Sequence, residues 1–297
     1  MQGHQDIRIG TLVPVKPNAA EYIRQILPHG FESFELTFGE HIGEVDLDRL
    51  ADRVLETLAT DGKGAVISSL GVYGNPLIDQ RTAEDIARVI DVADRFGCSM
   101  VCGFAGRIVD VPIPESIDAF RRVFEPLARR AEDRGIRIAF ENCNMDGTWE
   151  RGDWNIAHAP AAWEMMFEAV PSPALGLEWE PCHQMVSLIE PLTQLRQWAH
   201  RVFHVHGKDA TVDWEAIRAR GIRGGETYVQ HRTPGFGDTN WTDVISILRQ
   251  SGFRGSIDIE GWHDPVYRDR LEMTGQVRAL HYLQECRGGS FIANPNV

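Results

Sequence analysis

The sequence predicts an α/β protein that folds as one (β/α)8 TIM barrel, and two patterns support this prediction. Short segments rich in Val, Ile and Phe alternate with longer segments whose apolar residues recur every three or four positions. The alternation runs along the whole chain, which is typical of a parallel sheet covered by helices. Eight strand candidates in 297 residues match the barrel, whose eight strand–helix units take about 250 residues.

Each predicted strand is short and apolar, and helical periodicity returns between most of them. Strands are expected at residues 7–13, 31–38, 65–73, 99–106, 136–144, 174–183, 201–209 and 255–262. Helices are expected at residues 47–59, 83–96, 116–134, 161–170, 241–250 and 271–285.

Glycine marks the ends of several predicted helices. Gly30, Gly97, Gly135 and Gly252 each stand between a helical segment and a strand, where glycine can take the left-handed conformation that closes a helix. The main departure from the repeat is the segment 212–238, which is rich in glycine. We expect this segment to form a long loop that follows the seventh strand and overhangs the active face.

The domain organisation is expected to be simple. Residues 1–287 would form the barrel, and residues 288–297, where Gly, Ser, Asn and Pro gather, would form a flexible tail. No apolar run approaches the roughly 20 residues that cross a bilayer. The first residues lack the basic and then apolar pattern of a secretory signal. We therefore expect a cytoplasmic protein with no membrane contact.

Charge and cysteine content exclude several classes of function. The chain has 30 Lys and Arg residues against 43 Asp and Glu residues, and its net charge of −13 argues against a nucleic-acid partner. The cysteines are odd in number, scattered and without a C-x-x-C spacing, which indicates buried thiols in a reducing compartment rather than a disulfide or zinc framework. They are Cys98, Cys102, Cys143, Cys182 and Cys286.

Four consecutive strand candidates end in ionisable residues. Active sites of such barrels lie at the C-terminal ends of the strands, so these side chains would meet at one mouth. Carboxylates with one imidazole suit Mn²⁺ best, with Mg²⁺ or Co²⁺ as alternatives, and any one of them alone could instead form an ion pair. The candidate metal ligands are Glu141, Glu180, His206 and Glu260.

Residues two apart on a strand point to the same side, so two of these candidates have a neighbour one layer deeper in the barrel. Glu178 precedes Glu180 in this way, and His204 precedes His206. The sequence leaves the choice of ligand within each pair open. We expect His204 to be a packed, hydrogen-bonded residue of the barrel.

Five motifs in chain order resemble those of a known family. They are Phe140-Glu141-Asn142, Gly176-Leu177-x-x-Glu180-Pro181-x-His183, His206-x-Lys208-Asp209, Arg232-x-Pro234-Gly235-x-Gly237-x-x-x-Trp241, and Ile259-Glu260 followed by His263-Asp264-Pro265. With these motifs, nearly the whole chain resembles the xylose isomerase-like TIM barrels, a superfamily of sugar isomerases and epimerases.

The resemblance implies roles for the residues at the mouth. In ketose epimerases of this group, the residues matching Glu141 and Glu260 bind the metal and exchange the substrate proton, and those matching Glu180 and His206 complete the metal shell. The family usually has Asp where this chain has Glu180. That longer side chain would shift the position or selectivity of the metal.

The same resemblance suggests which residues contact the substrate. His183 and Arg232 would hold hydroxyl groups of a sugar, and His183 is also a candidate catalytic base, as is His158. The remaining candidates for substrate binding rest on position near the mouth or on aromatic character, although tryptophans in a loop could equally cap the core. They are Lys208, which could instead hold the metal ligands in place, Trp149, Trp154 and His263.

The leading functional prediction is a metal-dependent isomerase or epimerase of carbohydrate metabolism. It would abstract a proton alpha to the carbonyl of a ketose or 3-keto sugar and pass through an enediolate. The alternative is a lyase or deglycosidase that cleaves a 3-keto C- or O-glycoside after the same step. Relatives of that kind often use a histidine base where this chain has Cys143 and Asn144.

Two further classes fit the sequence less well. A metal nuclease of the apurinic type would need a basic face that the composition does not provide. A binding protein without catalysis would not need both proton-transfer carboxylates. The expected partner is a small sugar or glycoside, and the chain is expected to form homo-oligomers, or hetero-oligomers with a small subunit if it is a lyase.

Overall fold

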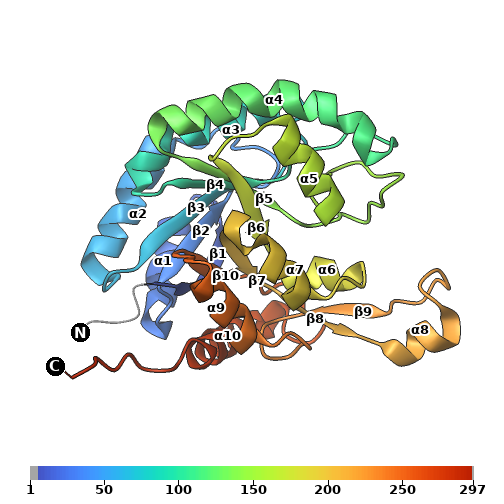
Figure 1. Ribbon diagram of the computed structural model, residues 1–297. Helices are drawn as coiled ribbons and strands as arrows, with labels where there is room; N and C mark the ends of the chain where they lie inside the picture. Colours follow the sequence, from blue (N-terminus) through green and yellow to red (C-terminus); the bar gives the residue numbers. More distant parts are fainter. Residues whose placement is uncertain (1–5, 296–297) are drawn as a thin grey trace.

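A computed structural model describes residues 6–295, and the predicted (β/α)8 barrel is confirmed. Residues 1–5, which make up most of the N-terminal segment considered above, and residues 296–297 at the end of the predicted tail lie outside the described residues. Eight parallel strands close in the order β1-β10-β7-β6-β5-β4-β3-β2, with helices wrapped around the outside (Figure 1). Their bounds are β1 Arg8–Pro14, β2 Ser33–Thr37, β3 Val66–Val72, β4 Met100–Gly103, β5 Arg137–Glu141, β6 Leu175–Trp179, β7 Val202–Gly207 and β10 Ser256–Ile259.

The helices form the outer layer of the barrel. All six predicted helices are present, and the structure adds helices after β1 and β6, where Pro residues and short length weaken the helical pattern. The α-helices are α1 Ala19–Ile26, α2 Leu47–Asp61, α3 Gln80–Val92, α4 Ile113–Arg134, α5 Pro160–Ala169, α6 Pro181–Val186, α7 Pro191–Trp198, α8 Trp214–Arg220, α9 Trp241–Gln250 and α10 Glu272–Cys286. Short 3₁₀ turns lie at Leu27–His29, Ala93–Phe96, Ala199–Arg201 and Asp269–Leu271.

The glycines predicted to end helices all have the expected backbone conformation. Gly30, Gly97, Gly135 and Gly252 have φ angles of 96°, 65°, 67° and 83°. These values lie in the left-handed region, which a residue with a Cβ atom rarely adopts. The glycines therefore turn the chain from each helix or 3₁₀ turn towards the next strand.

The segment predicted as one long loop has secondary structure of its own. Strands β8 (Asp209–Val212) and β9 (Val229–Arg232) pair in antiparallel fashion, and α8 lies between them. Each strand has only four residues, so alternation of apolar and polar residues is too brief to predict either strand from the sequence. This hairpin projects away from the barrel (Figure 1), so only its base lies near the mouth.

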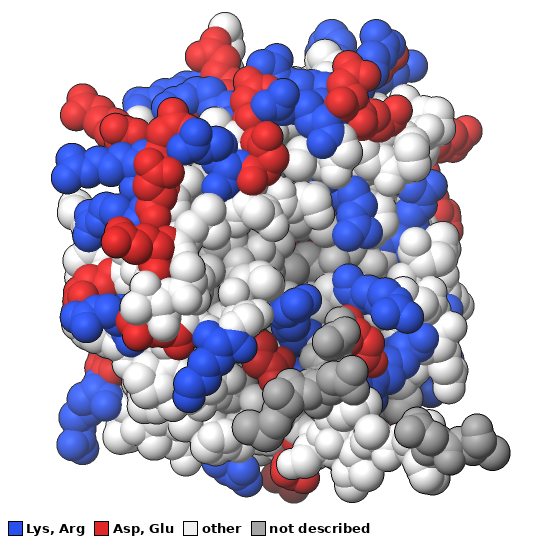
Figure 2. Space-filling model, turned by 90° about the vertical axis from the view of Figure 1, so that its left-hand side faces the viewer, with Lys and Arg blue, Asp and Glu red and all other residues white. Residues whose placement is uncertain are grey.

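The interior of the barrel is apolar around a polar centre, and the surface is charged. Ile, Val, Leu and Phe side chains from strands and helices form one continuous core. On the face shown in Figure 2, Lys and Arg side chains are interleaved with Asp and Glu side chains. Ion pairs such as Arg95 with Asp52 and Arg130 with Asp91 link neighbouring helices. Within residues 6–295, no helix is long and apolar enough to cross a membrane.

Gly10 on β1 is a sensitive position of the barrel. A Cβ atom there would lie 2.1 Å from the carbonyl oxygen of Ser33 and 2.2 Å from Oδ1 of Asp258. We expect Gly10→Ala to lower the free energy of unfolding by about 3 kcal/mol, because the backbones of β1 and β2 must separate. Chemical denaturation measures this change. Gly207→Ala on β7 is a matched control, since its nearest contact would be 3.2 Å, and an equal loss in both variants would contradict the argument.

Candidate active site

Four side chains from neighbouring strands of the barrel converge at its C-terminal mouth. Glu141 is the last residue of β5, Glu180 and Glu260 directly follow β6 and β10, and His206 lies on β7. One ligand atom from each lies within 4.8 Å of the others, and all four residues are buried. The structure therefore brings together the four residues predicted as metal ligands.

Asn142 aligns two of these ligands. Its side-chain amide donates to the carbonyl oxygen of Glu180 at 2.9 Å, and its side-chain oxygen accepts from the backbone N–H of Glu180 at 2.7 Å. This pair of bonds continues the pairing of β5 with β6 beyond the end of the sheet. The backbone of Glu180 is thereby fixed beside the end of β5, where Glu141 lies.

The imidazole of His206 connects two layers of carboxylates. Its Nε2 lies 3.0 Å from Oε1 of Glu178 and 3.2 Å from Oε2 of Glu35, deeper in the barrel. Its Nδ1 lies 3.3 Å from Oε1 of Glu141 and 3.5 Å from Oε2 of Glu260, towards the mouth. With a cation bound at the mouth, a proton on Nε2 would satisfy the deep carboxylates, and the Nδ1 lone pair would be available to the cation.

The donor atoms at the mouth fit a cation. Among the described residues, Oε1 of Glu180, Nδ1 of His206 and Oε2 of Glu260 are buried atoms that have no hydrogen-bond partner. Buried acceptors are costly unless a donor or a cation meets them. Because these three atoms belong to one cluster with Glu141, a divalent cation would satisfy all of them together.

The electrostatics of the cluster support the same conclusion. Burial, together with the nearby Glu141 and Glu260, raises the pKa of Glu180 well above its ordinary value. Burial also disfavours ionisation of Glu260, but Lys208 and His263 outweigh it and hold its pKa well below the ordinary value. Burial opposes protonation of His206, but Glu178 and Glu35 raise its pKa well above the ordinary value, so the cluster as a whole attracts positive charge.

A second, deeper cluster explains the pairs of residues that the sequence left unresolved. His204 lies 2.8 Å from Oε1 of Glu178 through Nδ1 and 2.8 Å from Oδ2 of Asp258 through Nε2. Burial opposes its protonation, but these carboxylates raise its pKa to about 10. His204 is thus a hydrogen-bonded residue of the barrel interior, and His206 is the imidazole that faces the mouth.

Lys208 and His183 form a hydrogen-bonded pair at the edge of the cluster. Lys208 Nζ lies 2.9 Å from Oε1 of Glu260 and 3.3 Å from Nε2 of His183. Burial and the charge of Lys208 hold the pKa of His183 well below its ordinary value. Neutral His183 therefore accepts from Lys208 at Nε2 and donates from Nδ1 to Oδ1 of Asn144, 3.2 Å away.

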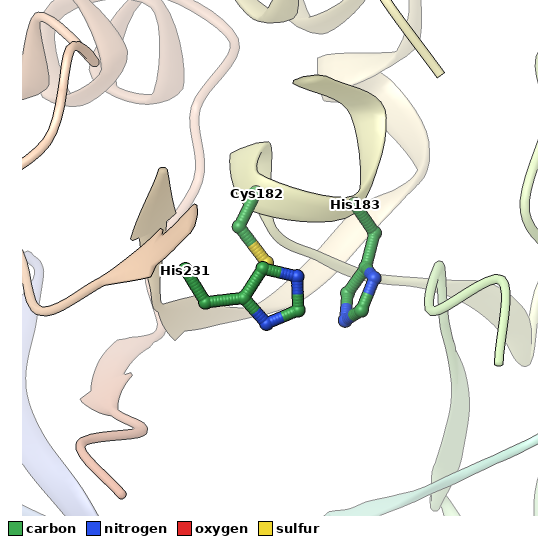
Figure 3. A group of neighbouring side chains, drawn as sticks. All are labelled: Cys182, His183 and His231. Carbon is green, nitrogen blue, oxygen red and sulfur yellow. The ribbon is translucent and has the colours of Figure 1, made fainter. Parts of the chain in front are cut away.

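A neighbouring group of Cys182, His183 and His231 is less suited to a metal. The rings of His183 and His231 meet edge to face with centroids 4.9 Å apart (Figure 3). However, both nitrogens of His183 already have partners, and one of them is the ammonium group of Lys208. Burial and the nearby Glu180 raise the pKa of Cys182 well above its ordinary value, so its thiol stays protonated.

A cavity of about 630 Å³ opens above the four-residue cluster. This volume is in the range of small-molecule sites. The predicted residues that line it are Glu141, Trp154, His183, His206, Lys208, Glu260 and His263. The structure adds wall residues that the sequence analysis missed, namely Tyr73, Phe104, His231 and Trp262. Tyr73, Phe104 and Trp262 stand at or near the ends of predicted strands, and that position was the available signal.

Two predicted substrate contacts lie elsewhere. Arg232 pairs with Asp264, whose Oδ2 lies 3.1 Å from its Nε, and so holds the base of the β8–β9 hairpin to the loop after β10. Trp149 packs against the barrel core, and its carbonyl oxygen accepts from the guanidinium of buried Arg107 at 3.1 Å. Neither residue lines the cavity, so their positions do not support the expected contact with substrate.

His158 also lies outside the cavity lining. It is buried, and its Nε2 has no hydrogen-bond partner among the described residues. Burial and the nearby charge of Arg107 lower its pKa to about 4. Its position removes the reason for treating it as a catalytic base and makes it a neutral histidine of the interior.

Comparison with known proteins identifies relatives of this fold. The family model for the xylose isomerase-like TIM barrel matches residues 23–286. An inosose dehydratase from Clostridium beijerinckii is 24% identical over 169 residues, which is 54% of this chain and 52%, about half, of that relative's length.

Two solved structures share the fold. A 3-keto-D-glucoside 4-epimerase from E. coli has a TM-score of 0.67 at 16% identity and covers 94% of this chain and 100% of its own. A xylose isomerase-like TIM barrel protein from Mycobacterium smegmatis in complex with magnesium has a TM-score of 0.71 at 16% identity and covers 94% and 96%. At these identities, the similarity establishes the architecture.

The buried His158 gives a measurable pH dependence. Its pKa of about 4 in the folded chain lies below the ordinary 6.5, so the unfolded chain binds more protons between these values. Stability is therefore lost as the pH falls from 7 to 4, by about 3 kcal/mol from this residue alone. In His158→Gln, denaturation at both pH values should show a loss smaller by that amount. His200→Gln, at an exposed position, is the control, and parallel pH profiles for wild type and His158→Gln would contradict the assignment.

Proposed function

The chain belongs to the xylose isomerase-like TIM barrel family, and from this premise we propose that it is a divalent-metal-dependent sugar epimerase or isomerase. Its substrate would be a ketose or a 3-keto sugar. One observation carries the proposal: the carboxylates of Glu141 and Glu260, from strands that are not neighbours in the barrel, approach the same nitrogen of His206. A substrate bound above His206 would have a carboxylate on either side.

Glu141, Glu180, His206 and Glu260 would hold the metal. When bound, the ion would polarise the substrate carbonyl and stabilise the negative charge that develops on its oxygen. Mn²⁺ is our first choice for three carboxylates and one imidazole, with Mg²⁺ and Co²⁺ as alternatives. The unpartnered buried acceptors of the cluster and the magnesium complex of a structural neighbour support a divalent cation.

The two carboxylates would move the proton. Glu141 would accept the proton from the carbon beside the ketone, and the electron pair of the broken C–H bond would form the enediolate. Glu260, on the other side, would take a proton from solvent through His263 and deliver it to that carbon, which inverts its configuration. Lys208 keeps Glu260 ionised and oriented, so Glu260 can equally act as the base in the reverse direction.

The remaining wall residues would orient the sugar and exclude water. Neutral His183 is fixed by Asn144 and Lys208, so its ring has a defined position at the wall. Trp154 and Trp262 offer apolar faces of the kind on which sugar rings pack. His263, which lies 2.9 Å from Oε1 of Glu260, is half-exposed and could exchange protons with solvent.

A lyase acting after the same proton abstraction is the second candidate. The dehydratase name of the curated relative favours it, since a dehydratase eliminates a group beside the abstracted proton. The imidazoles of His183, His231 and His263 line the same cavity. One of them could donate a hydrogen bond or a proton to the oxygen that leaves. In this case the chain would release an aglycone or water instead of an epimer, and a small partner subunit would be expected.

The proposed proton abstraction is tested by exchange with solvent. Metal-loaded protein in D₂O should incorporate deuterium into at least one member of a panel of ketoses and 3-keto glycosides, as measured by mass spectrometry. Glu141→Gln and Glu260→Gln should each reduce this exchange at least about 1,000-fold, because each removes a proton-transfer group. Unchanged circular dichroism would show that the variants fold. Near-normal exchange in either variant would refute the proposal, and release of an aglycone would select the lyase.

Metal binding can be tested without a substrate. Wild-type protein stripped of metal should bind one Mn²⁺ per chain in a calorimetric titration, with an increase in melting temperature. Glu180→Gln should weaken binding at least about tenfold, because it replaces one of the unpartnered carboxylates of the cluster with a neutral amide. Glu190→Gln, on the outside of the barrel, is a control of the same type. Equal affinities for the two variants would place the metal elsewhere.

A further inference from the structure

A second cavity adjoins the one above the candidate metal cluster. It has a volume of about 350 Å³ and lies beside the loop between β1 and α1. Leu12 and Trp262 line both cavities, so the two spaces share a wall. Trp262 is 37% exposed, and part of its indole ring is therefore available to a ligand.

Two charged side chains, Glu272 and Lys16, belong to the lining of this second cavity. Oε1 of Glu272 accepts from Nε2 of Gln276 at 2.9 Å, and Oε1 of Gln276 accepts from Thr11 on β1 at 2.6 Å. The carboxylate of Glu272 is thus fixed to the barrel through two hydrogen bonds. Lys16 lines the same cavity and is exposed.

The character of the lining selects a class of ligand. Lys16 and Glu272 contribute one positive and one negative charge, so these two side chains together favour a ligand without net charge. Tyr22 and Asn18 add neutral hydrogen-bonding groups, and Trp262 adds an aromatic surface. A neutral ring that carries hydroxyl groups fits this combination, because its faces are apolar and its edge donates and accepts hydrogen bonds.

We propose that this cavity is a second subsite, which binds a hydroxylated ring joined to the reacting sugar, with Trp262 between the two rings. The assignment of the first cavity to the reacting sugar rests on the function proposed above. The substrate is then a glycoside of two rings, a disaccharide or a phenolic glycoside, rather than a free monosaccharide. Binding energy from the second ring would position the first over Glu141 and Glu260.

Binding of unreactive probes tests the subsite directly. Full-length, Mn²⁺-loaded protein is titrated calorimetrically with methyl β-D-glucoside, which has one ring, and with cellobiose and 4-hydroxyphenyl β-D-glucoside, which have two. We expect at least one two-ring probe to bind about tenfold more tightly than the one-ring probe. The better of the two identifies the second ring as a sugar or a phenol.

Variants locate the added affinity. Lys16→Met and Glu272→Gln should each reduce the advantage of the two-ring probe at least about threefold, since each removes a polar partner of the second ring. Lys63→Met and Glu56→Gln are matched controls at exposed positions away from both cavities. Loss of the advantage only in the first two variants supports the subsite.

Other results overturn the subsite. Equal affinity for one-ring and two-ring probes does so, as does the absence of measurable binding by all three, or an advantage that Lys16→Met and Glu272→Gln leave intact. The deuterium exchange experiment described above tests the catalytic proposal independently of the subsite. Exchange without a two-ring advantage would refute the subsite alone, whereas a two-ring advantage without exchange of any ketone would refute the catalytic proposal alone.

Discussion

The site depends on the two-sided bonding of His206. A neutral imidazole can donate a hydrogen bond from one nitrogen and accept one at the other. Here the carboxylates of Glu178 and Glu35, deeper in the barrel, face Nε2 and can accept its hydrogen bond. Nδ1 lies beside Glu141 and Glu260, where it could bind a cation in place of a proton. The deep cluster thus determines what the mouth can bind, although none of its carboxylates belongs to the four-residue cluster at the mouth.

The regular geometry of the barrel strands places most of these side chains. Side chains two residues apart on a strand point to the same side, so Glu178 and His204 form the lower layer where Glu180 and His206 form the upper one. Pairing of β6 with β7 brings Glu178 against His204. Beyond the end of the sheet, the side chain of Asn142 makes two hydrogen bonds with the backbone of Glu180. These bonds keep the chain after β6 beside the end of β5.

Residues on strand ends could be predicted from the sequence because their placement follows from the repeat. The four candidate ligands and the packed His204 are of this kind. Arg232 and Trp149 could not be placed, because their surroundings are set by loops: Arg232 meets Asp264, which follows another strand, and Trp149 lies in a loop held by buried Arg107. Tyr73 and Phe104, which also line the cavity above the cluster, directly follow β3 and β4. These strands do not end in a carboxylate or an imidazole that would have indicated a site.

Charge balance explains why the mouth can be so deeply buried. Glu141, Glu180 and Glu260 contribute three negative charges, and Lys208 returns one positive charge. A divalent cation would bring the sum to zero, with His206 and His183 neutral. Glu180, one methylene longer than the aspartate usual in the family, reaches to within 3.9 Å of Lys208 Nζ while its other oxygen stays directed at the cluster. Lys208 therefore lies within ion-pair distance of two of the candidate ligands, Glu180 and Glu260.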